Sequence, residues 1–266
     1  MDLQLNGKRA LVTGGSKGIG RAIARQLALE GVDIVIAARN AADVDIAARE
    51  LAAETGRKIV GLTVDTQDDN SVRALVAGTV AALGGLDILV NAAAKPGGQT
   101  PPPKLAEITD DLFWDDVDVK VMGYVRTARE AAPHMAAAGW GRIINISGLA
   151  ARQTGSIIGS IRNVAVAALT KNLADELGPK GINVTVVHPG LTRTEKTAPL
   201  VAARAASAGV SPEEIERRLA ANVTIGRLVD MAEVADVVAF LASPRSVAIN
   251  GDAIACGGGV TGPIHY

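Results

Sequence analysis

A glycine-rich turn near the start of the chain constrains the fold more than any other feature. The sequence TGGSKGIG occupies residues 13–20, between an apolar run at residues 9–12 and a helical pattern that extends to residue 30. Gly14 and Gly18 allow the backbone to turn tightly and approach a pyrophosphate, and Gly20 allows the helix to pack closely against the strand. The free N–H groups of the helix N-terminus then face the anion. A glycine cluster alone is not specific, but this strand–turn–helix context predicts a dinucleotide site.

The rest of the chain repeats the alternation of strand and helix. Short β-branched runs occur at residues 9–12, 33–37, 59–64, 86–90, 142–146, 183–187 and 248–255, and helical patterns at residues 19–30, 41–54, 71–83, 115–138, 158–177 and 232–241. Apolar strands separated by helices are typical of a parallel sheet covered on both faces. We therefore predict an α/β Rossmann fold, with a doubly wound, parallel seven-stranded sheet in a three-layer αβα arrangement. No break in composition marks a boundary, so residues 1–266 are expected to form a single domain.

Composition excludes several classes of function. The net charge of −1 shows no basic excess, so neither nucleic acid nor a membrane surface is an expected partner. The sequence contains no run of about 18 apolar residues and no pattern typical of a signal peptide. The lone Cys256 excludes an internal disulfide and fits a reducing compartment. These features predict a cytoplasmic protein that acts on a small molecule.

Two segments interrupt the alternation. Residues 95–104 (KPGGQTPPPK) follow the fourth predicted strand, and residues 191–223 lie between the sixth strand and the last helix. The second segment contains a helix start at Ser211, with proline and two glutamates after it. Both segments follow the carboxyl ends of strands, where ligands bind in such sheets. We interpret them as a substrate rim and, at residues 191–223, a lid; the alternative is two mobile surface loops.

Residues at the end of the second strand indicate which dinucleotide is bound. A site that prefers NAD places an acidic residue there to bind the ribose 2′-hydroxyl. This chain has Ala38 followed by Arg39, and Lys17 lies within the glycine turn. Two cations near a 2′-phosphate favour NADP(H) over NAD(H). The alternative is that both are ordinary solvated charges.

At this point the sequence resembles the short-chain dehydrogenase/reductase family over nearly its whole length. TGGSKGIG matches the family's TGxxxGxG, Asp65 matches the acid that contacts adenine, and residues 91–94 (NAAA) resemble its NNAG with two departures. Residues 189–194 match PGxxxT, and the segment from Asn250 to Gly258 resembles its last strand. The resemblance implies the following cofactor-contacting residues: Gly14, Ser16, Lys17, Gly18, Ile19, Gly20, Arg39, Asp65, Thr66, Asn91, Ala92, Ala93, Asn163, Pro189, Gly190, Thr192 and Thr194.

The residues that carry the chemistry in this family are expected to be missing. Members use a tyrosine and a lysine, as YxxxK, together with a serine and an asparagine. Residues 141–147 (GRIINIS) and 170–176 (TKNLADE) anchor the comparison and place YxxxK on residues 159–163, GSIRN. The tyrosine position is then Gly159, the lysine position Asn163, the serine position Gly148 and the asparagine position Lys120. The two tyrosines of the chain are Tyr124 and Tyr266, so no register restores YxxxK.

Loss of a general acid lowers a rate by about 10²–10⁴-fold, so another group is expected to replace it. Lys120 is the first candidate, as a desolvated lysine that titrates near neutrality or as a cation that fills the space of the family's lysine. Ser147 is a candidate oxyanion donor and Asn163 a candidate ribose ligand. The alternative for Ser147 is a simple backbone hydrogen bond, and Tyr124 is more typical of a core or dimer-face aromatic.

The remaining candidates are less specific. Ser160 and Arg162 flank the altered motif, and Arg162 either orients an anionic substrate or faces solvent. His188 precedes a Pro-Gly turn, where a structural role is typical. His265 and Tyr266 end the chain and would act only in trans on a neighbouring subunit. No His, Cys and carboxylate cluster has metal-ligand spacing, so no catalytic metal is expected.

Three functions remain open from the sequence. The first is an NADP(H)-dependent oxidoreductase with a rebuilt proton-donor site, acting on a small carbonyl, alcohol or activated alkene. The second is a non-redox enzyme on the same scaffold, such as a lyase that uses Lys120, or a hydrolase. The third is a non-catalytic NADP(H) sensor. The helical patterns at residues 115–138 and 158–177 correspond to the helices with which family members dimerise, so we expect a homodimer or homotetramer.

Overall fold

The computed structural model describes residues 1–95 and 101–261, and its centre is a parallel sheet of seven strands. The strand order β3-β2-β1-β4-β5-β6-β9 confirms the predicted doubly wound topology. The strands are β1 (Arg9–Thr13), β2 (Asp33–Ala38), β3 (Ile59–Thr63), β4 (Ile88–Asn91), β5 (Gly141–Ile146), β6 (Ile182–Pro189) and β9 (Ala253–Cys256). Every residue of β4 and β5 is buried, as expected for strands covered on both faces.

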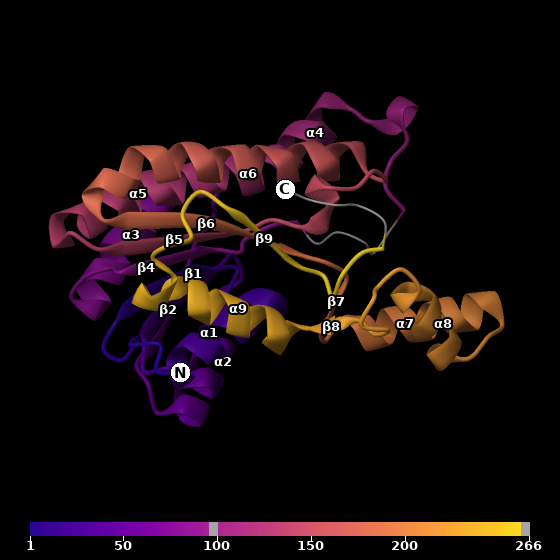
Figure 1. The fold of residues 1–266 in the computed structure, drawn as a ribbon, viewed down its shortest axis with the longest axis horizontal. Helices are drawn as coiled ribbons and strands as arrows, with labels where there is room; N and C mark the ends of the chain where they lie inside the picture. The colour runs from indigo at the N-terminus through magenta and orange to yellow at the C-terminus, as the bar shows by residue number, and fades with distance from the viewer. Residues whose placement is uncertain (96–100, 262–266) are drawn as a thin grey trace.

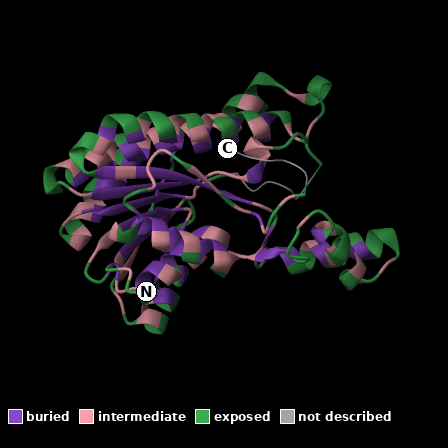
Figure 2. Ribbon diagram, viewed as in Figure 1, coloured by how far each residue is buried: buried purple, intermediate pink, exposed green. Residues whose placement is uncertain are grey.

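Helices cover both faces of this sheet, which gives the predicted three layers (Figure 1). One layer contains α1 (Gly18–Leu29), α2 (Ala41–Thr55) and α9 (Met231–Ala242), and the other α3 (Asp69–Leu83), α5 (Gly123–Ala138) and α6 (Ile157–Leu177). Two large apolar cores lie between the sheet and these layers. Figure 2 shows the strands buried and the outer helix faces exposed. Short 3₁₀ turns complete this framework: η1 (Leu105–Glu107), η3 (Leu149–Ala151), η4 (Gly178–Lys180) and η5 (Pro244–Ser246).

The last strand is shorter than predicted. It begins at residue 253, whereas the sequence pattern indicated residue 248. The preceding residues form a turn that is held against β6: Asn250 accepts a hydrogen bond from the Val184 N–H, and the Gly251 N–H donates to the Val184 carbonyl. Gly251 has a φ of 78°, which ends the extended backbone there.

The helix predicted at residues 115–138 begins earlier and is not uniform. It starts as α4 (Asp110–Val117), where the Thr109 side chain accepts a hydrogen bond from the Leu112 N–H. A π-helical segment, η2 (Asp118–Met122), separates α4 from α5. Such wide turns are rare and occur frequently at functional sites. This one carries Lys120, which it places inside the protein.

Residues 191–223 contain two helices and one strand of a small second sheet. The helices are α7 (Thr197–Ala208) and α8 (Pro212–Ala220), and β7 (Thr192–Arg193) pairs with β8 (Val229–Asp230). The predicted start of α8 is confirmed, because the Ser211 hydroxyl accepts a hydrogen bond from the Glu214 N–H. The sequence analysis missed α7. Figure 1 shows α7 and α8 projecting from the layered body, and they share a small apolar core of their own. None of the helices in the described part of the chain is both long enough and apolar enough to span a bilayer.

Candidate functional site

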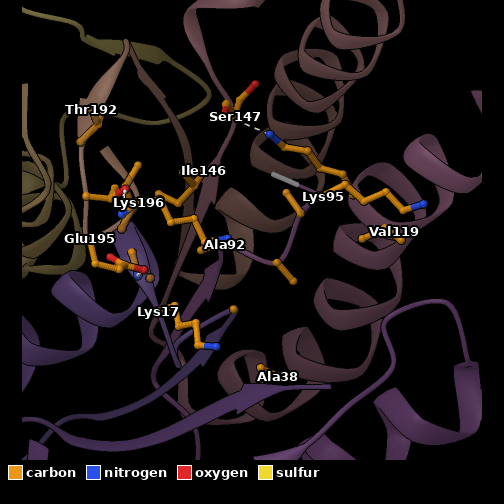
Figure 3. Close-up of a pocket in the computed structure, with 18 of the residues that line it drawn as sticks. Lys17, Ala38, Ala92, Lys95, Val119, Ile146, Ser147, Thr192, Glu195 and Lys196 are labelled. Carbon is orange, nitrogen blue, oxygen red and sulfur yellow. Dashed lines mark hydrogen bonds between the residues drawn. The ribbon is translucent and has the colours of Figure 1, made fainter. Parts of the chain in front are cut away.

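A cavity of about 850 Å³ lies at the carboxyl ends of the strands. Its volume falls within the range of about 300–1,000 Å³ that is typical of small-molecule sites. Figure 3 shows Thr192, Glu195 and Lys196 on one side of this cavity and Lys95 and Val119 on the other. The predicted site residues that line it are Gly14, Lys17, Gly18, Ile19, Gly20, Arg39, Asp65, Thr66, Ala92, Ala93, Lys120, Ser147, Gly190, Thr192 and Thr194. The other four, Ser16, Asn91, Asn163 and Pro189, are buried and do not line it.

The glycine turn at one end of the cavity leaves no room for side chains. A Cβ atom on Gly14 would lie 2.7 Å from the Ala92 carbonyl oxygen, and Gly14 has a φ of +69°. A Cβ atom on Gly20 would collide with the Gly14 carbonyl. At Gly18 a Cβ atom would meet only Thr194 and Glu195, at 3.9 Å, but the φ of +56° is one that residues with side chains rarely adopt. The turn therefore brings bare backbone to the wall of the cavity, as a pyrophosphate site requires.

A carboxylate from residues 191–223 lies at the glycine turn. Glu195 Oε1 accepts a hydrogen bond from the Gly18 N–H at 3.1 Å, directly at the N-terminus of α1. Figure 3 shows Glu195 above Lys17 on the same side of the cavity. The carboxylate thus uses one of the free helix N–H groups that would bind a phosphate. The sequence analysis did not identify Glu195, because nothing in the local pattern connects it to a turn so distant in the chain.

The two cations predicted for the 2′-phosphate have different surroundings. Arg39 is exposed at the cavity wall beside Ala38. Lys17 forms an ion pair with Asp43, whose carboxylate lies 2.6 Å from the Lys17 Nζ. Asp43 lies in the first turn of α2 and therefore offsets the charge of Lys17. Arg39 is the better placed of the two cations for a phosphate.

Asn91 supports the site from within the core. Its amide donates to Asn145 Oδ1 at 3.0 Å and its carbonyl oxygen accepts from Thr127 Oγ1 at 2.7 Å. The Asn145 amide in turn donates to Thr170 Oγ1 at 2.9 Å. These fully buried contacts connect β4, β5, α5 and α6, so they fix the strand ends that form the floor of the cavity.

Lys120 reaches the centre of the cavity floor. Its Nζ donates to the Ser147 carbonyl at 3.0 Å and to Asn163 Oδ1 at 2.9 Å, and only 3% of the residue is exposed. Figure 3 shows the bond at Ser147 as a dashed line. Burial lowers the pKa of Lys120 to about 7, with a further lowering from Arg162 and an opposing effect from Asp116. The side chain therefore exchanges a proton readily at neutral pH.

Ser147 and Asn163 are coupled to this lysine. The Ser147 hydroxyl donates to the Asn163 carbonyl at 3.1 Å, so strand β5 and helix α6 hold each other at this point. Gly148 lets the Asn163 amide approach its backbone closely, because a Cβ atom there would lie 3.1 Å from Asn163 Nδ2. The Gly159 N–H donates to Ser156 Oγ at the N-cap of α6. Neither glycine supplies a hydroxyl. The structure thus brings together Lys120, Ser147 and Asn163, the three residues predicted to carry chemistry.

Arg162 forms a second charged group beside Lys120. Its Nη1 pairs with Asp116 of α4, while its buried Nε has no hydrogen-bond partner among the described residues. Arg162 is 9% exposed and lines the cavity, so it does not face solvent. The sequence analysis missed Asp116, since its partner is 46 residues away on another helix.

The other candidate residues lie outside the cavity or outside the described chain. The Tyr124 hydroxyl donates to the Ile146 carbonyl at 2.9 Å, and burial raises the Tyr124 pKa far above its usual value. It is a core aromatic. Ser160 donates to the Gln153 carbonyl, and His188 is buried in β6. His265 and Tyr266 lie outside the described residues, as do residues 96–100 of the predicted rim.

The sequence of this chain matches one protein-family model over nearly its whole length. The model describes enoyl-(acyl carrier protein) reductases and matches residues 14–261. That range contains Gly14, Gly18 and Gly20 of the glycine turn, Lys120, the segment around Asn163 and residues 191–223.

Individual proteins are similar over the same extent. The chain is 35% identical to the cis-4-hydroxycyclohexanecarboxylate dehydrogenase of Sinomonas cyclohexanicum, covering 95% of this chain and 96% of that protein. It is 32% identical to the 3-oxoacyl-(acyl-carrier-protein) reductase of Aquifex aeolicus, covering 98% and 100%. Among solved structures, L-sorbose reductase from Gluconobacter frateurii, complexed with NADPH and L-sorbose, superposes with a TM-score of 0.93 at 30% identity, covering 99% of this chain and 100% of that chain.

Proposed function

Because the chain belongs to the short-chain dehydrogenase/reductase family of oxidoreductases, we propose that it is an NADP(H)-dependent oxidoreductase with an altered proton-donor site. Its substrate would be a small-molecule carbonyl, alcohol or activated alkene. The observation that carries the proposal is the position of Lys120, which lines the same cavity as the glycine turn and whose Nζ is bonded to Asn163. The family's Ser, Tyr, Lys and Asn positions correspond here to Gly148, Gly159, Asn163 and Lys120.

The residues present fit the dinucleotide. The turn at Gly14, Gly18 and Gly20 exposes backbone where side chains would block a pyrophosphate. Arg39 lies at the end of β2, where a 2′-phosphate is bound in such folds. The solved relative named above binds NADPH, which supports NADP(H) over NAD(H) as the cofactor.

The chain's own residues would handle the proton. Bound NADPH supplies a hydride to the substrate carbon. Lys120 would give a proton to the substrate oxygen from its ammonium group, since Ser147 and Asn163 accept only two of its three N–H bonds. The pKa of about 7 allows the amine to recover a proton from water at neutral pH. Asn163, which is buried and does not line the cavity, would hold the ammonium in place.

A second function is favoured by a different observation. Gly148 and Gly159 offer no hydroxyl to a reacting oxygen, while the cofactor end retains its glycine turn and Arg39. A non-catalytic NADP(H) sensor would show this combination.

A lyase that forms a Schiff base is also compatible with an uncharged Lys120 amine, and borohydride trapping of a substrate adduct would detect it.

Deuteride transfer distinguishes these functions. NADPH carrying deuterium at the pro-S position would be incubated with the protein and a panel of ketones, quinones and enones, and products would be read by mass spectrometry. Deuterium bound to product carbon is the expected result. NADPH binding without transfer to any compound would support the sensor, and a dissociation constant above millimolar for both dinucleotides would exclude the sensor as well.

A further inference from the structure

We infer that the substrate of this site carries a carboxylate, which Arg162 binds next to Lys120. This inference rests on the proposed function and names its substrate class as small oxo acids or the corresponding hydroxy acids. It depends on three observations: a buried guanidinium with an unused donor, an excess of positive charge around it, and a cavity wall that both cations share.

The first observation is the incomplete hydrogen bonding of Arg162. Its Nη1 is paired with Asp116, but its buried Nε has no partner among the described residues. Guanidinium donors that are removed from water without a partner are costly, especially when the group is charged. The Nε itself is closed off from solvent, but Arg162 lines the cavity, so a bound ligand can reach the guanidinium from there. A carboxylate suits the planar fork of an arginine better than a neutral oxygen.

The second observation is the charge balance at this end of the cavity. Lys120 and Arg162 are two buried cations, and the Asp116 carboxylate pairs with Arg162 and also acts on Lys120. At the rim, Lys95 pairs with Asp115 and adds no net charge. The group is therefore left with one excess positive charge when Lys120 is protonated. A monoanionic carboxylate matches that excess, whereas a phosphate dianion exceeds it.

The third observation is that both cations face the same space. Lys120, Ser147 and Arg162 all line the cavity. A carboxylate held by Arg162 would place the rest of a small oxo acid beside the Lys120 ammonium. The carboxylate would also favour the charged form of Lys120, because an opposite charge in a buried site raises the pKa of an amine. Substrate binding would then protonate the group that must supply the proton.

Binding without turnover tests this inference. The protein with saturating NADP⁺ would be titrated with pyruvate, acetoacetate and 4-oxopentanoate, each compared with its methyl ester by calorimetry. We expect at least one acid to bind about 10- to 100-fold more tightly than its ester, as a charge-assisted contact provides. Arg162→Met should remove this preference. Arg152→Met changes an arginine outside the cavity lining, whose Nη2 donates to the Ala253 carbonyl, and should retain it.

Arg162→Met leaves the Asp116 carboxylate without its ion-pair partner, which could itself disturb folding or binding. The double variant Asp116→Asn/Arg162→Met removes that carboxylate and controls for its effect. Equal binding of acids and esters by the wild type would overturn the inference, and so would a preference that survives in both Arg162 variants. The proposed function fails separately. Acids that bind through Arg162 without any deuterium transfer would contradict the oxidoreductase but not the carboxylate site. Equal deuterium transfer to acids and esters would contradict the carboxylate site alone.

Discussion

The Glu195 carboxylate accepts a hydrogen bond from the Gly18 N–H, 3.1 Å away, at the point where α1 begins. Glu195 belongs to the segment 191–223 and Gly18 to the glycine turn, and they lie 177 positions apart in the chain. A pyrophosphate bound at this helix N-terminus needs the same N–H group and would lie close to the carboxylate. The acid must therefore move away, or repel the ligand, when the cofactor binds.

Glu195→Gln is expected to tighten NADPH binding by about 3- to 30-fold, the range that corresponds to a charge at a helix N-terminus. The glutamine keeps the size of the side chain and removes the negative charge. Titration of NADPH fluorescence gives the dissociation constant. Glu213→Gln, at the exposed start of α8, is the matched control and should leave it unchanged. Weaker binding by Glu195→Gln would show that the carboxylate assists the cofactor.

Arg39→Ala is expected to weaken NADPH binding by about 10- to 100-fold and NADH binding much less, because a charged hydrogen bond to the 2′-phosphate is lost. The ratio of the two dissociation constants is the measurement. Asp43→Asn releases Lys17 from its ion pair and should move the same ratio further toward NADPH. An unchanged ratio in Arg39→Ala would place the phosphate elsewhere.

Lys120→Met is expected to lower kcat for carbonyl reduction by about 10²–10⁴-fold, the usual effect of losing a general acid. In the wild type, kcat/KM should fall tenfold per pH unit above the Lys120 pKa of about 7, since only the ammonium can donate a proton and kcat/KM reports the free enzyme. Arg162, Asp116, Asn163 and the Ser147 carbonyl surround this group. Steady-state kinetics between about pH 6 and pH 9 provide the test. A flat profile would assign the donor to another group.

The same titration predicts how stability depends on pH. The unfolded chain holds the Lys120 proton up to the ordinary lysine pKa of 10.5, whereas the folded protein releases it at a pKa of about 7. Between these values the unfolded state binds more protons, so the free energy of unfolding rises with pH by about 1.4 kcal/mol per unit. Chemical denaturation of the wild type and of Lys120→Met at about pH 7.5, 8.5 and 9.5 gives the free energy of unfolding of each protein. The difference between the two free energies should grow as the pH rises. A constant difference would mean that Lys120 has an ordinary pKa.

We expect a homodimer or homotetramer that buries one face of α6. Ile157, Ile161 and Val164 are 44–50% exposed and share that face, being three and four positions apart. Ile161→Glu/Val164→Glu should shift the protein to a monomer at micromolar concentration, as measured by light scattering. Ile46→Glu, on α2 at a similar exposure of 47%, serves as the control. A wild-type monomer would contradict the expected assembly.

The sequence predicted the sheet and the cofactor turn because both have local signatures. The glycine turn is eight consecutive residues, and each strand is a short apolar run bounded by turn residues. Lys120 and Asn163 were found by their positions relative to two anchor segments. The hydrogen bond between them was not foreseen, because it connects η2 to α6 across 43 positions.

Other features could not be predicted for a related physical reason. The π-helical turn at residues 118–122 has an ordinary helical sequence. Its wider geometry occurs together with contacts to distant residues, such as the hydrogen bond that the Thr66 hydroxyl donates to the Val119 carbonyl. The Asp116–Arg162 pair and the Glu195 contact depend on segments that meet only in the folded chain. Periodicity carries no information about such pairs.

The contact between Lys120 and Asn163 also limits how this site can change by mutation. A chain with asparagine at 120 and lysine at 163 would contain the same two groups in exchanged places. Asn163→Lys alone would put two ammonium groups within hydrogen-bond distance in a buried space, and Lys120→Asn alone would leave the pair with no cation. Each single substitution would therefore impair the site. Only the double substitution Lys120→Asn/Asn163→Lys would keep one ammonium group and one amide in contact.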